Sequence, residues 1–271
     1  MTRADRDVPG VTARTVADNP WSALRRFTDA RIALGRSGAS LPTAPLLAFT
    51  VAHAQARDAV HTSLDIEALR AELERRTLDS IEVRSAAQSR EQYLRRPDLG
   101  RVLDPESAAL LEQHAVSAET RPDLVFVIAD GLSAQAAASH ALPLIDRTIA
   151  QLKGWRVSSI VVATQARVAI GDPIGELMNA EMVAVLIGER PGLSSPASLG
   201  VYLTYAPRSG RSDAERNCIS NVRPEGLSYD AAAFKLVHLL EGARKRKLTG
   251  VELKDESVWD GRLLPTDDVR A

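Results

Sequence analysis

Four short polar segments hold the residues best suited to chemistry, and each comes after an apolar run. They are residues 130–133, 165–172, 188–195 and 216–221. Each is rich in Gly, in small polar side chains or in charge, and Ser133 is placed to cap a following helix whose first amides attract anions. In an open α/β sheet, ligands bind beyond the carboxyl ends of the strands. The spacing therefore predicts that these segments form one polar rim that binds a ligand.

Each candidate in these segments also has an ordinary structural interpretation. Asp130 and Asp172 both precede helical patterns and have the residue type of a helix cap. Glu189 and Arg190 have the pattern of a solvated ion pair, and a free Cys such as Cys218 is most often a small buried apolar residue. The residue types alone leave both interpretations open.

Several familiar catalytic motifs are missing. The five His residues show no HExxH or other paired metal-ligand spacing. There is no Walker A sequence, no strict GxGxxG after a strand candidate and no GxSxG elbow. The sequence therefore lacks the usual support for an ATPase, a dinucleotide dehydrogenase or a serine hydrolase.

Strand and helix patterns alternate in the second half of the chain. Near-continuous apolar runs at 124–129, 155–164, 182–188 and 201–205 are separated by helical patterns. Continuous apolar strands of this kind are typical of a parallel sheet that is covered on both faces. The predicted fold class is α/β, with a Rossmann-like open parallel sheet and a helical N-terminal extension.

The same patterns predict how the chain is organised. We expect a flexible N-terminal tail at 1–18, a helical N-terminal region at 19–120, an α/β domain at 121–255 and a C-terminal tail at 256–271. The helical region is rich in Arg. It is either a docking surface for a partner or a solvated basic face.

Composition narrows the classes of protein further. The 271 residues are 45% hydrophobic and 25% charged, which excludes a fully disordered or fibrous chain. A net charge of −1 gives no field toward nucleic acid or an anionic membrane, and one Cys excludes an intramolecular disulfide. No apolar run approaches the roughly 20 residues of a membrane helix, and residues 1–8 do not resemble a secretory signal. We expect a cytoplasmic protein that binds neither nucleic acid nor a membrane.

Eight sequence pieces, taken in order, carry a family resemblance over roughly residues 19–254. They are the pieces at 19–21, 27–36, 93–100, 123–133, 167–172, 188–195, 202–208 and 217–221. Together they resemble the small subunit (light chain) of ethanolamine ammonia-lyase. Asp-Gly-Leu-Ser at 130–133 is a weak signal alone, but the ordered set is specific.

The resemblance implies a hetero-oligomeric enzyme that depends on adenosylcobalamin and converts ethanolamine to acetaldehyde and ammonia. In that family the large subunit is a TIM barrel that holds ethanolamine and the catalytic side chains. The cobalamin lies between it and the small subunit. The cobalamin-binding part of this chain then corresponds to the α/β domain at 121–255.

The resemblance also assigns cofactor-binding residues, which correspond here to Val168, Glu189 and Cys218. Glu189 offers carboxylate acceptors to amide or hydroxyl donors, and Val168 and Cys218 are small enough for close packing. It implies no catalytic residue and no metal ligand in this chain. The pattern Asp-x-His-x-x-Gly, typical of an axial protein His on cobalt, is absent. We therefore expect the cofactor's own dimethylbenzimidazole to stay on the metal.

Two other classes of function stay open at this stage. One is a stand-alone nucleotide-binding α/β enzyme that uses the same loops, and the other is a non-catalytic scaffold subunit. The family also leaves two locations open, the free cytoplasm and a bacterial microcompartment.

Overall fold

The computed structural model describes residues 16–17, 19–117 and 120–261. The chain divides into two compact units, 1–55 and 56–271. Of the tails predicted at 1–18 and 256–271, only residues 16, 17 and 256–261 are among those described.

The first unit has short elements and little core. A 3₁₀ helix, η1 (Pro20–Phe27), begins where the Asn19 side chain accepts a hydrogen bond from the amide of Trp21, and none of its residues is buried. Helix α1 (Thr43–His61) follows and runs across the boundary into the second unit. Apolar side chains therefore stay exposed here, among them Trp21 at 66% and Phe27 at 72%.

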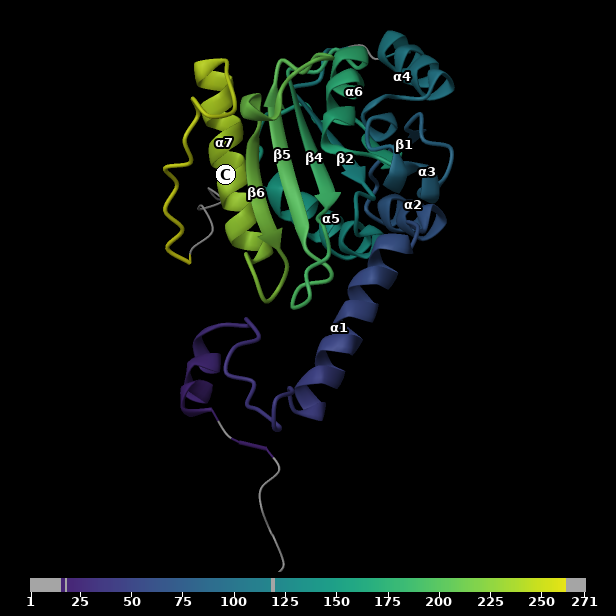
Figure 1. Cartoon of the computed structure of the whole chain (residues 1–271). Helices are drawn as coiled ribbons and strands as arrows, with labels where there is room; N and C mark the ends of the chain where they lie inside the picture. The colour runs from purple at the N-terminus through teal and green to yellow at the C-terminus, as the bar shows by residue number, and fades with distance from the viewer. Residues whose placement is uncertain (1–15, 18, 118–119, 262–271) are drawn as a thin grey trace, which may run out of the picture. The chain divides into compact units, whose positions relative to one another are not determined.

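The second unit is built around one open sheet of six strands (Figure 1). The strand order is β1-β3-β2-β4-β5-β6. The strands are β1 (Ser80–Arg84), β2 (Leu124–Ala129), β3 (Ile160–Thr164), β4 (Met182–Gly188), β5 (Leu199–Tyr205) and β6 (Asn217–Val222). The helices of this unit are α2 (Ile66–Arg75), α3 (Arg90–Arg95), η2 (Leu99–Arg101), α4 (Pro105–Ser117), α5 (Ala134–Ile149), η3 (Val168–Ile170), α6 (Gly171–Leu177), η4 (Asp213–Glu215) and α7 (Tyr229–Arg246).

The α/β class is confirmed, with one departure from an all-parallel sheet. Strands β1, β3, β2 and β4 are parallel, as the continuous apolar runs predict. Strand β5, in contrast, is antiparallel to both β4 and β6. A short hairpin-like connection, rather than a crossover helix, joins β4 to β5, and short connections permit only antiparallel neighbours.

Two strands were not predicted from the sequence. Strand β1 lies within residues 19–120, where only helices were expected, because its Ser-Ile-Glu-Val-Arg pattern is short and half polar. Strand β6 occupies 217–222, where a loop was expected. Only Ile219 and Val222 of this strand are buried, because only one of its faces packs on the core.

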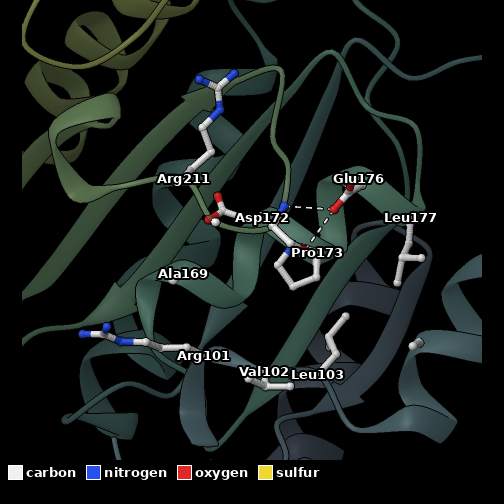
Figure 2. A pocket seen from close by; sticks show the side chains of 12 residues that line it. Arg101, Val102, Leu103, Ala169, Asp172, Pro173, Glu176, Leu177 and Arg211 are labelled. Atoms are coloured by element: carbon white, nitrogen blue, oxygen red, sulfur yellow. Dashed lines mark hydrogen bonds between the residues drawn. The ribbon is translucent and has the colours of Figure 1, made fainter. Parts of the chain in front are cut away.

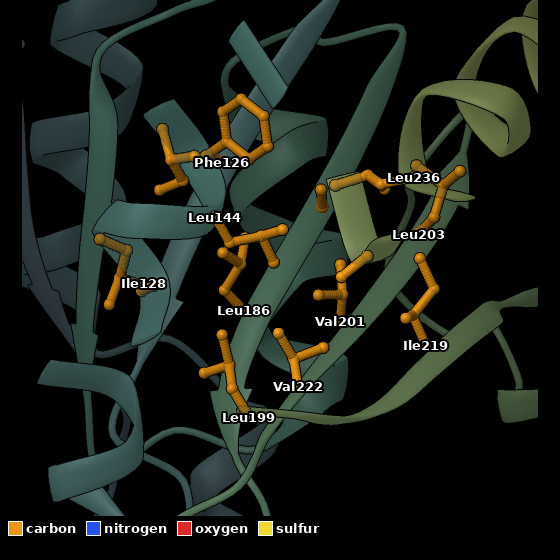
Figure 3. Packing of buried hydrophobic residues seen from close by; sticks show 14 of the residues in the cluster. Phe126, Ile128, Leu144, Leu186, Leu199, Val201, Leu203, Ile219, Val222 and Leu236 are labelled. Atoms are coloured by element: carbon orange, nitrogen blue, oxygen red, sulfur yellow. The ribbon is translucent and has the colours of Figure 1, made fainter. Parts of the chain in front are cut away.

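Two layers of helices cover the sheet and divide the core into two clusters. On one face, α2, α5 and α7 bury a cluster that includes Phe126, Leu144 and Leu236 (Figure 3). On the other, α4, η3 and α6 bury a second cluster that includes Val127 and Val185. All six residues of β2 are buried because this strand is covered on both sides. The second face is the one that matters for the site.

Candidate functional site

The helix layer on the second face ends before the last two strands. Residues Tyr202 of β5 and Cys218 of β6 lie opposite one another in the register, and Tyr202 in turn lies opposite Val185 of β4. Val185 packs in the second cluster, yet Tyr202 is half-buried and Cys218 is exposed. In the described part of the chain no helix covers these strands on this side. We call Gly200, Tyr202, Cys218 and Ser220 the β5–β6 face.

Glu189 borders the β5–β6 face at the carboxyl end of β4. Its Oε2 accepts a hydrogen bond of 2.6 Å from the Ser198 hydroxyl, and its carboxylate accepts one of 3.3 Å from the backbone amide of Asn221. Because β6 is parallel to β4, Asn221 reaches the same edge of the sheet. Glu189 therefore lies at the end of β4, where the strand-end rule predicts it. Its neighbour there is strand β6 itself, at the position where a loop was expected.

Gly200 leaves the space that the Glu189 side chain occupies. A Cβ at this position would lie 3.1 Å from Glu189 Oε1 and 3.3 Å from the Tyr202 ring. A side chain on Gly200 would therefore push the carboxylate or the ring aside. The absence of one keeps the β5–β6 face low and the carboxylate fixed at its border.

Tyr202 links Cys218 to Glu189 and was not among the predicted site residues. Burial raises the pKa of the Tyr202 hydroxyl, and a hydrogen bond with Cys218 and the nearby charge of Glu189 raise it further. The phenol is therefore neutral at any physiological pH. The available signal was its place two residues after Gly200, since alternation along a strand puts both residues on the same face.

Val168 reaches the same side of the sheet from the opposite direction. It opens η3 directly after β3, is half-buried and packs on the second cluster. Three residues later, Gly171 lies against β4, where an added Cβ would be 2.4 Å from Val185 Cγ2. The segment with Val168 therefore lies over β4, beside the strand that carries Tyr202. Val168, Glu189 and Cys218 thus lie on one side of the sheet, and no hydrogen bond of the described structure joins any two of them.

An ion pair joins the Val168 segment to the start of β6. Arg216 donates to both oxygens of Asp172, at 2.6 and 2.7 Å, and also to the hydroxyl of Thr204 at 3.1 Å. Burial by itself lowers the pKa of Arg216, but the hydrogen bond and charge of Asp172 raise it overall. Asp172 is therefore not the side-chain cap of α6. It fixes α6 against the two outer strands.

Asp130 is not a helix cap either. Ser133 caps α5, as predicted, by accepting from the amide of Ala136. The Asp130 carboxylate, which is 1% exposed, instead accepts hydrogen bonds from the amides of Gln165 and Ala166 at 2.9 and 3.0 Å. Burial raises the pKa of Asp130, and these amides and Arg90 counteract that rise. Asp130 therefore fixes the turn that leads to Val168.

The chain's own side chains fill the usual ligand crevice of an open sheet. That crevice lies between β2 and β3, whose loops lead to helices on opposite faces. Arg90 lies there and donates to the carbonyls of Val60 and Gly131, both at 2.8 Å, while its guanidinium stacks on Tyr93. Tyr93 is fully buried beside it. Arg90 and Tyr93 therefore occupy this crevice.

One pocket of the described residues has Ala169, the neighbour of Val168, in its lining and includes no residue of the β5–β6 face (Figure 2). It has a volume of about 550 Å³ and is lined by Arg101, Val102, Leu103, Ala108, Ala169, Asp172, Pro173, Glu176, Leu177, Ser209, Gly210 and Arg211. Glu176 accepts hydrogen bonds of 2.9 Å from the backbone and the hydroxyl of Ser209, and Asp172 is paired with Arg216. Its carboxylates are therefore already engaged within the fold.

The described residues form neither a metal-binding group nor a membrane-spanning helix. Among the residues described, no three His, Cys, Asp or Glu side chains come together as a metal-binding group. Within the same residues, every helix is too short or too polar to cross a membrane.

Comparison with known proteins decides the family. The family model described as ethanolamine ammonia-lyase light chain (EutC) matches residues 18–254. The chain belongs to this family. Ethanolamine ammonia-lyase small subunits from three bacteria illustrate the match. That of Azotobacter vinelandii is 59% identical over 89% of this chain and 90% of its own length. That of Ralstonia nicotianae is 56% identical over 90% and 91%, and that of Pseudomonas aeruginosa is 53% identical over 93% and 92%. The light-chain family is that of a carbon–nitrogen lyase, so the resemblance of the sequence pieces is confirmed.

Proposed function

We propose that this chain is the subunit of ethanolamine ammonia-lyase that holds adenosylcobalamin against a large subunit. The enzyme then deaminates ethanolamine to acetaldehyde and ammonia. The proposal is supported by the position of Glu189 and Cys218 at the β5–β6 face, which no described helix covers, with Val168 on the same side of the sheet. Relatives named as small subunits of this enzyme match nearly the whole chain, which supports the same conclusion.

The shape of the β5–β6 face suits a broad, flat ligand. Gly200 has no side chain, the aromatic ring of Tyr202 is half-buried, and Cys218 and Ser220 are small. A macrocycle that lies on these residues buries apolar surface without displacing a helix. The Tyr202 hydroxyl is neutral and adds no charge to this face.

The hydrogen-bond acceptors of Glu189 at this border suit a ligand with amide side chains. A carboxylate has about four lone-pair sites, and hydrogen bonds from Ser198 and Asn221 leave part of this capacity unused at Glu189. An amide of the corrin periphery is such a donor. Because Ser198 and Asn221 fix the carboxylate in advance, little side-chain entropy is lost when it binds a further donor.

The division of labour between the subunits follows from what this chain lacks at the site. Adenosylcobalamin, when bound, supplies the radical that begins the deamination. Glu189 orients the ligand, while Val168 and Cys218 pack against it. The large subunit, a TIM barrel in this proposal, holds ethanolamine and covers the β5–β6 face, which excludes water from the reaction.

The two alternative functions fit the described residues less well. A stand-alone nucleotide-binding enzyme needs the crevice between β2 and β3, which Arg90 and Tyr93 fill. A non-catalytic scaffold needs no uncovered face with a prepared carboxylate.

Binding by the Glu189→Ala variant tests the proposal. We expect the complex with the large subunit to assemble normally and to retain cobalamin about 10- to 100-fold less tightly, because one hydrogen bond to a charged group is lost. Cobalamin retention is measured by absorbance after gel filtration. Glu112→Ala, which removes an exposed carboxylate of α4, is the matched control and leaves retention unchanged. Equal retention by both variants and the wild type contradicts the role of Glu189.

Cys218 provides an independent test because it is the chain's only Cys and is exposed. We expect iodoacetamide to modify it readily in the isolated chain and much more slowly in the complex with cobalamin bound. Mass spectrometry of this chain measures the rate, and Cys218→Ser gives the background. Unchanged reactivity in the loaded complex contradicts the placement of the ligand on the β5–β6 face.

A further inference from the structure

Buried polar atoms without partners gather at one edge of the sheet. Seven such side-chain atoms occur in the described residues, and four of them belong to segments that follow the parallel strands β1, β3 and β4. These four are Arg90 Nη2, Gln165 Oε1, Arg167 Nε and Ser195 Oγ. Unsatisfied buried groups are costly in native proteins, and a cluster of them indicates a missing partner such as a bound ligand.

Arg167 is the member of this cluster that the fold holds in place without pairing its charge. Its guanidinium carbon lies 4.3 Å from the centre of the Tyr93 ring, and its backbone amide donates to the Gly100 carbonyl at 2.7 Å. A Cβ on Gly100 would lie 2.8 Å from Arg167 Cγ, so this Gly makes room for the side chain. Tyr93 is fixed in turn, since its hydroxyl donates to the Ala166 carbonyl at 3.1 Å.

The local charge around Arg167 is positive. Arg90 stacks on the same Tyr93 ring at 4.8 Å, and its side chain is 10% exposed. Asp130 pairs with Arg90 and accepts hydrogen bonds from the backbone amides that follow β3. Among the described residues, no carboxylate pairs with Arg167. One preorganised cation therefore stays unneutralised directly before Val168.

We propose that Arg167 binds the phosphodiester of the cofactor's nucleotide tail. The proposal rests on the function proposed above. The amide side chains of a cobalamin are neutral, and its tail carries one anionic group, the phosphodiester between the corrin side chain and the ribose. Guanidinium matches such a group in geometry and charge. Arg167 and Glu189 then divide the ligand between them, the cation taking the anionic tail and the carboxylate taking amide donors.

The test compares two corrinoids on the assembled complex in buffer free of phosphate and sulfate. Cyanocobalamin carries the nucleotide tail, whereas cobinamide lacks the nucleotide and its phosphodiester. For Arg167→Gln we expect cyanocobalamin to bind about 10- to 100-fold more weakly and cobinamide to bind as it does to the wild type. Equilibrium dialysis with absorbance gives both affinities and requires no turnover.

The matched control is Arg95→Gln, which removes an exposed Arg from α3 that pairs with Glu91. It changes neither affinity. Arg167→Lys is the second variant if the glutamine variant does not assemble, and the same difference between the two corrinoids is measured for it.

Three results overturn the proposal. If Arg167→Gln weakens both corrinoids equally, the residue only supports the fold. If it weakens neither, no anion binds there. If inorganic phosphate binds the cobalamin-saturated complex as tightly as the empty complex, and Arg167→Gln abolishes that binding, the site takes a free anion instead. Failure of the proposed function looks different, because the wild-type complex then retains neither corrinoid.

Discussion

The buried ion pair between Asp172 and Arg216 makes the sharpest prediction about this fold. Both side chains are 2% exposed, and the guanidinium binds both carboxylate oxygens. In Asp172→Asn the new amide nitrogen faces a guanidinium nitrogen, so one hydrogen bond becomes a contact between two donors. Arg216 keeps its bonds to Thr204 and to the Arg211 carbonyl, but its buried charge has lost its main counter-ion.

The expected loss follows from that burial. Breaking a buried pair by removing one partner costs roughly 3–5 kcal/mol, whereas an exposed pair costs about 1 kcal/mol or less. Arg216 also reaches Asp213, which is 87% exposed and too well solvated to replace Asp172. We therefore expect Asp172→Asn to lower the free energy of unfolding by about 3–5 kcal/mol.

Urea unfolding of the full chain, followed by Trp fluorescence, measures this loss. The control is the double variant Asp172→Leu with Arg216→Met, which removes both buried charges at once. It should lose much less than the single variant, because neither charge is then left without a partner. A loss below about 1 kcal/mol for Asp172→Asn refutes the reasoning, since the pair then behaves as a surface pair.

Two further predictions concern other parts of the sheet. Burial alone would raise the pKa of Asp123, but hydrogen bonds from Arg156 lower it to about 2. Because this value is below the roughly 3.9 of an unfolded Asp, the carboxylate stabilises the fold above pH ~4, and the effect is lost as the pH falls toward ~2. Asp123→Asn should lower the free energy of unfolding by about 1–2 kcal/mol at pH 7, a value reduced because Arg156 is more than half exposed. A difference in stability between variant and wild type that does not change with pH contradicts this. Thermal unfolding should show that Gly131→Ala lowers the stability by about 1–3 kcal/mol more than Gly154→Ala does. Both glycines have positive φ, but an added Cβ at Gly131 would lie 2.2 Å from the backbone oxygen of Gly188, whereas one at Gly154 would meet nothing within 4 Å. Equal losses would show that backbone strain alone matters at both positions.

Local sequence signals predicted much of the fold. The strands at 124–129 and 182–188 were predicted at their observed bounds, because a strand covered on both faces has an unbroken apolar run. The cap of α5 was equally clear, because Ser133 accepts the predicted hydrogen bond from a backbone amide. The candidate site was found through family resemblance, and the strand-end rule agreed with it at Glu189.

Other features could not be predicted locally. Strand β6 buries only Ile219 and Val222, and a polar stretch with Asn221 and Cys218 has the composition of a loop until a neighbouring strand is known. The assignment of Asp130 and Asp172 as caps was wrong for a related reason. Both precede helices, but their partners lie more than 30 residues away in the sequence.

The sequence by itself determined the family, the α/β class and the central parallel strands, because these depend on apolar runs and on residues close together along the chain. Only the tertiary structure decided that β5 runs antiparallel to its two neighbours, that Arg90 fills the crevice, and that Arg167 keeps an unpaired charge beside Val168. Each of these depends on which distant groups come into contact, and a buried charge or hydrogen bond is settled by its neighbours in space rather than by its neighbours in sequence.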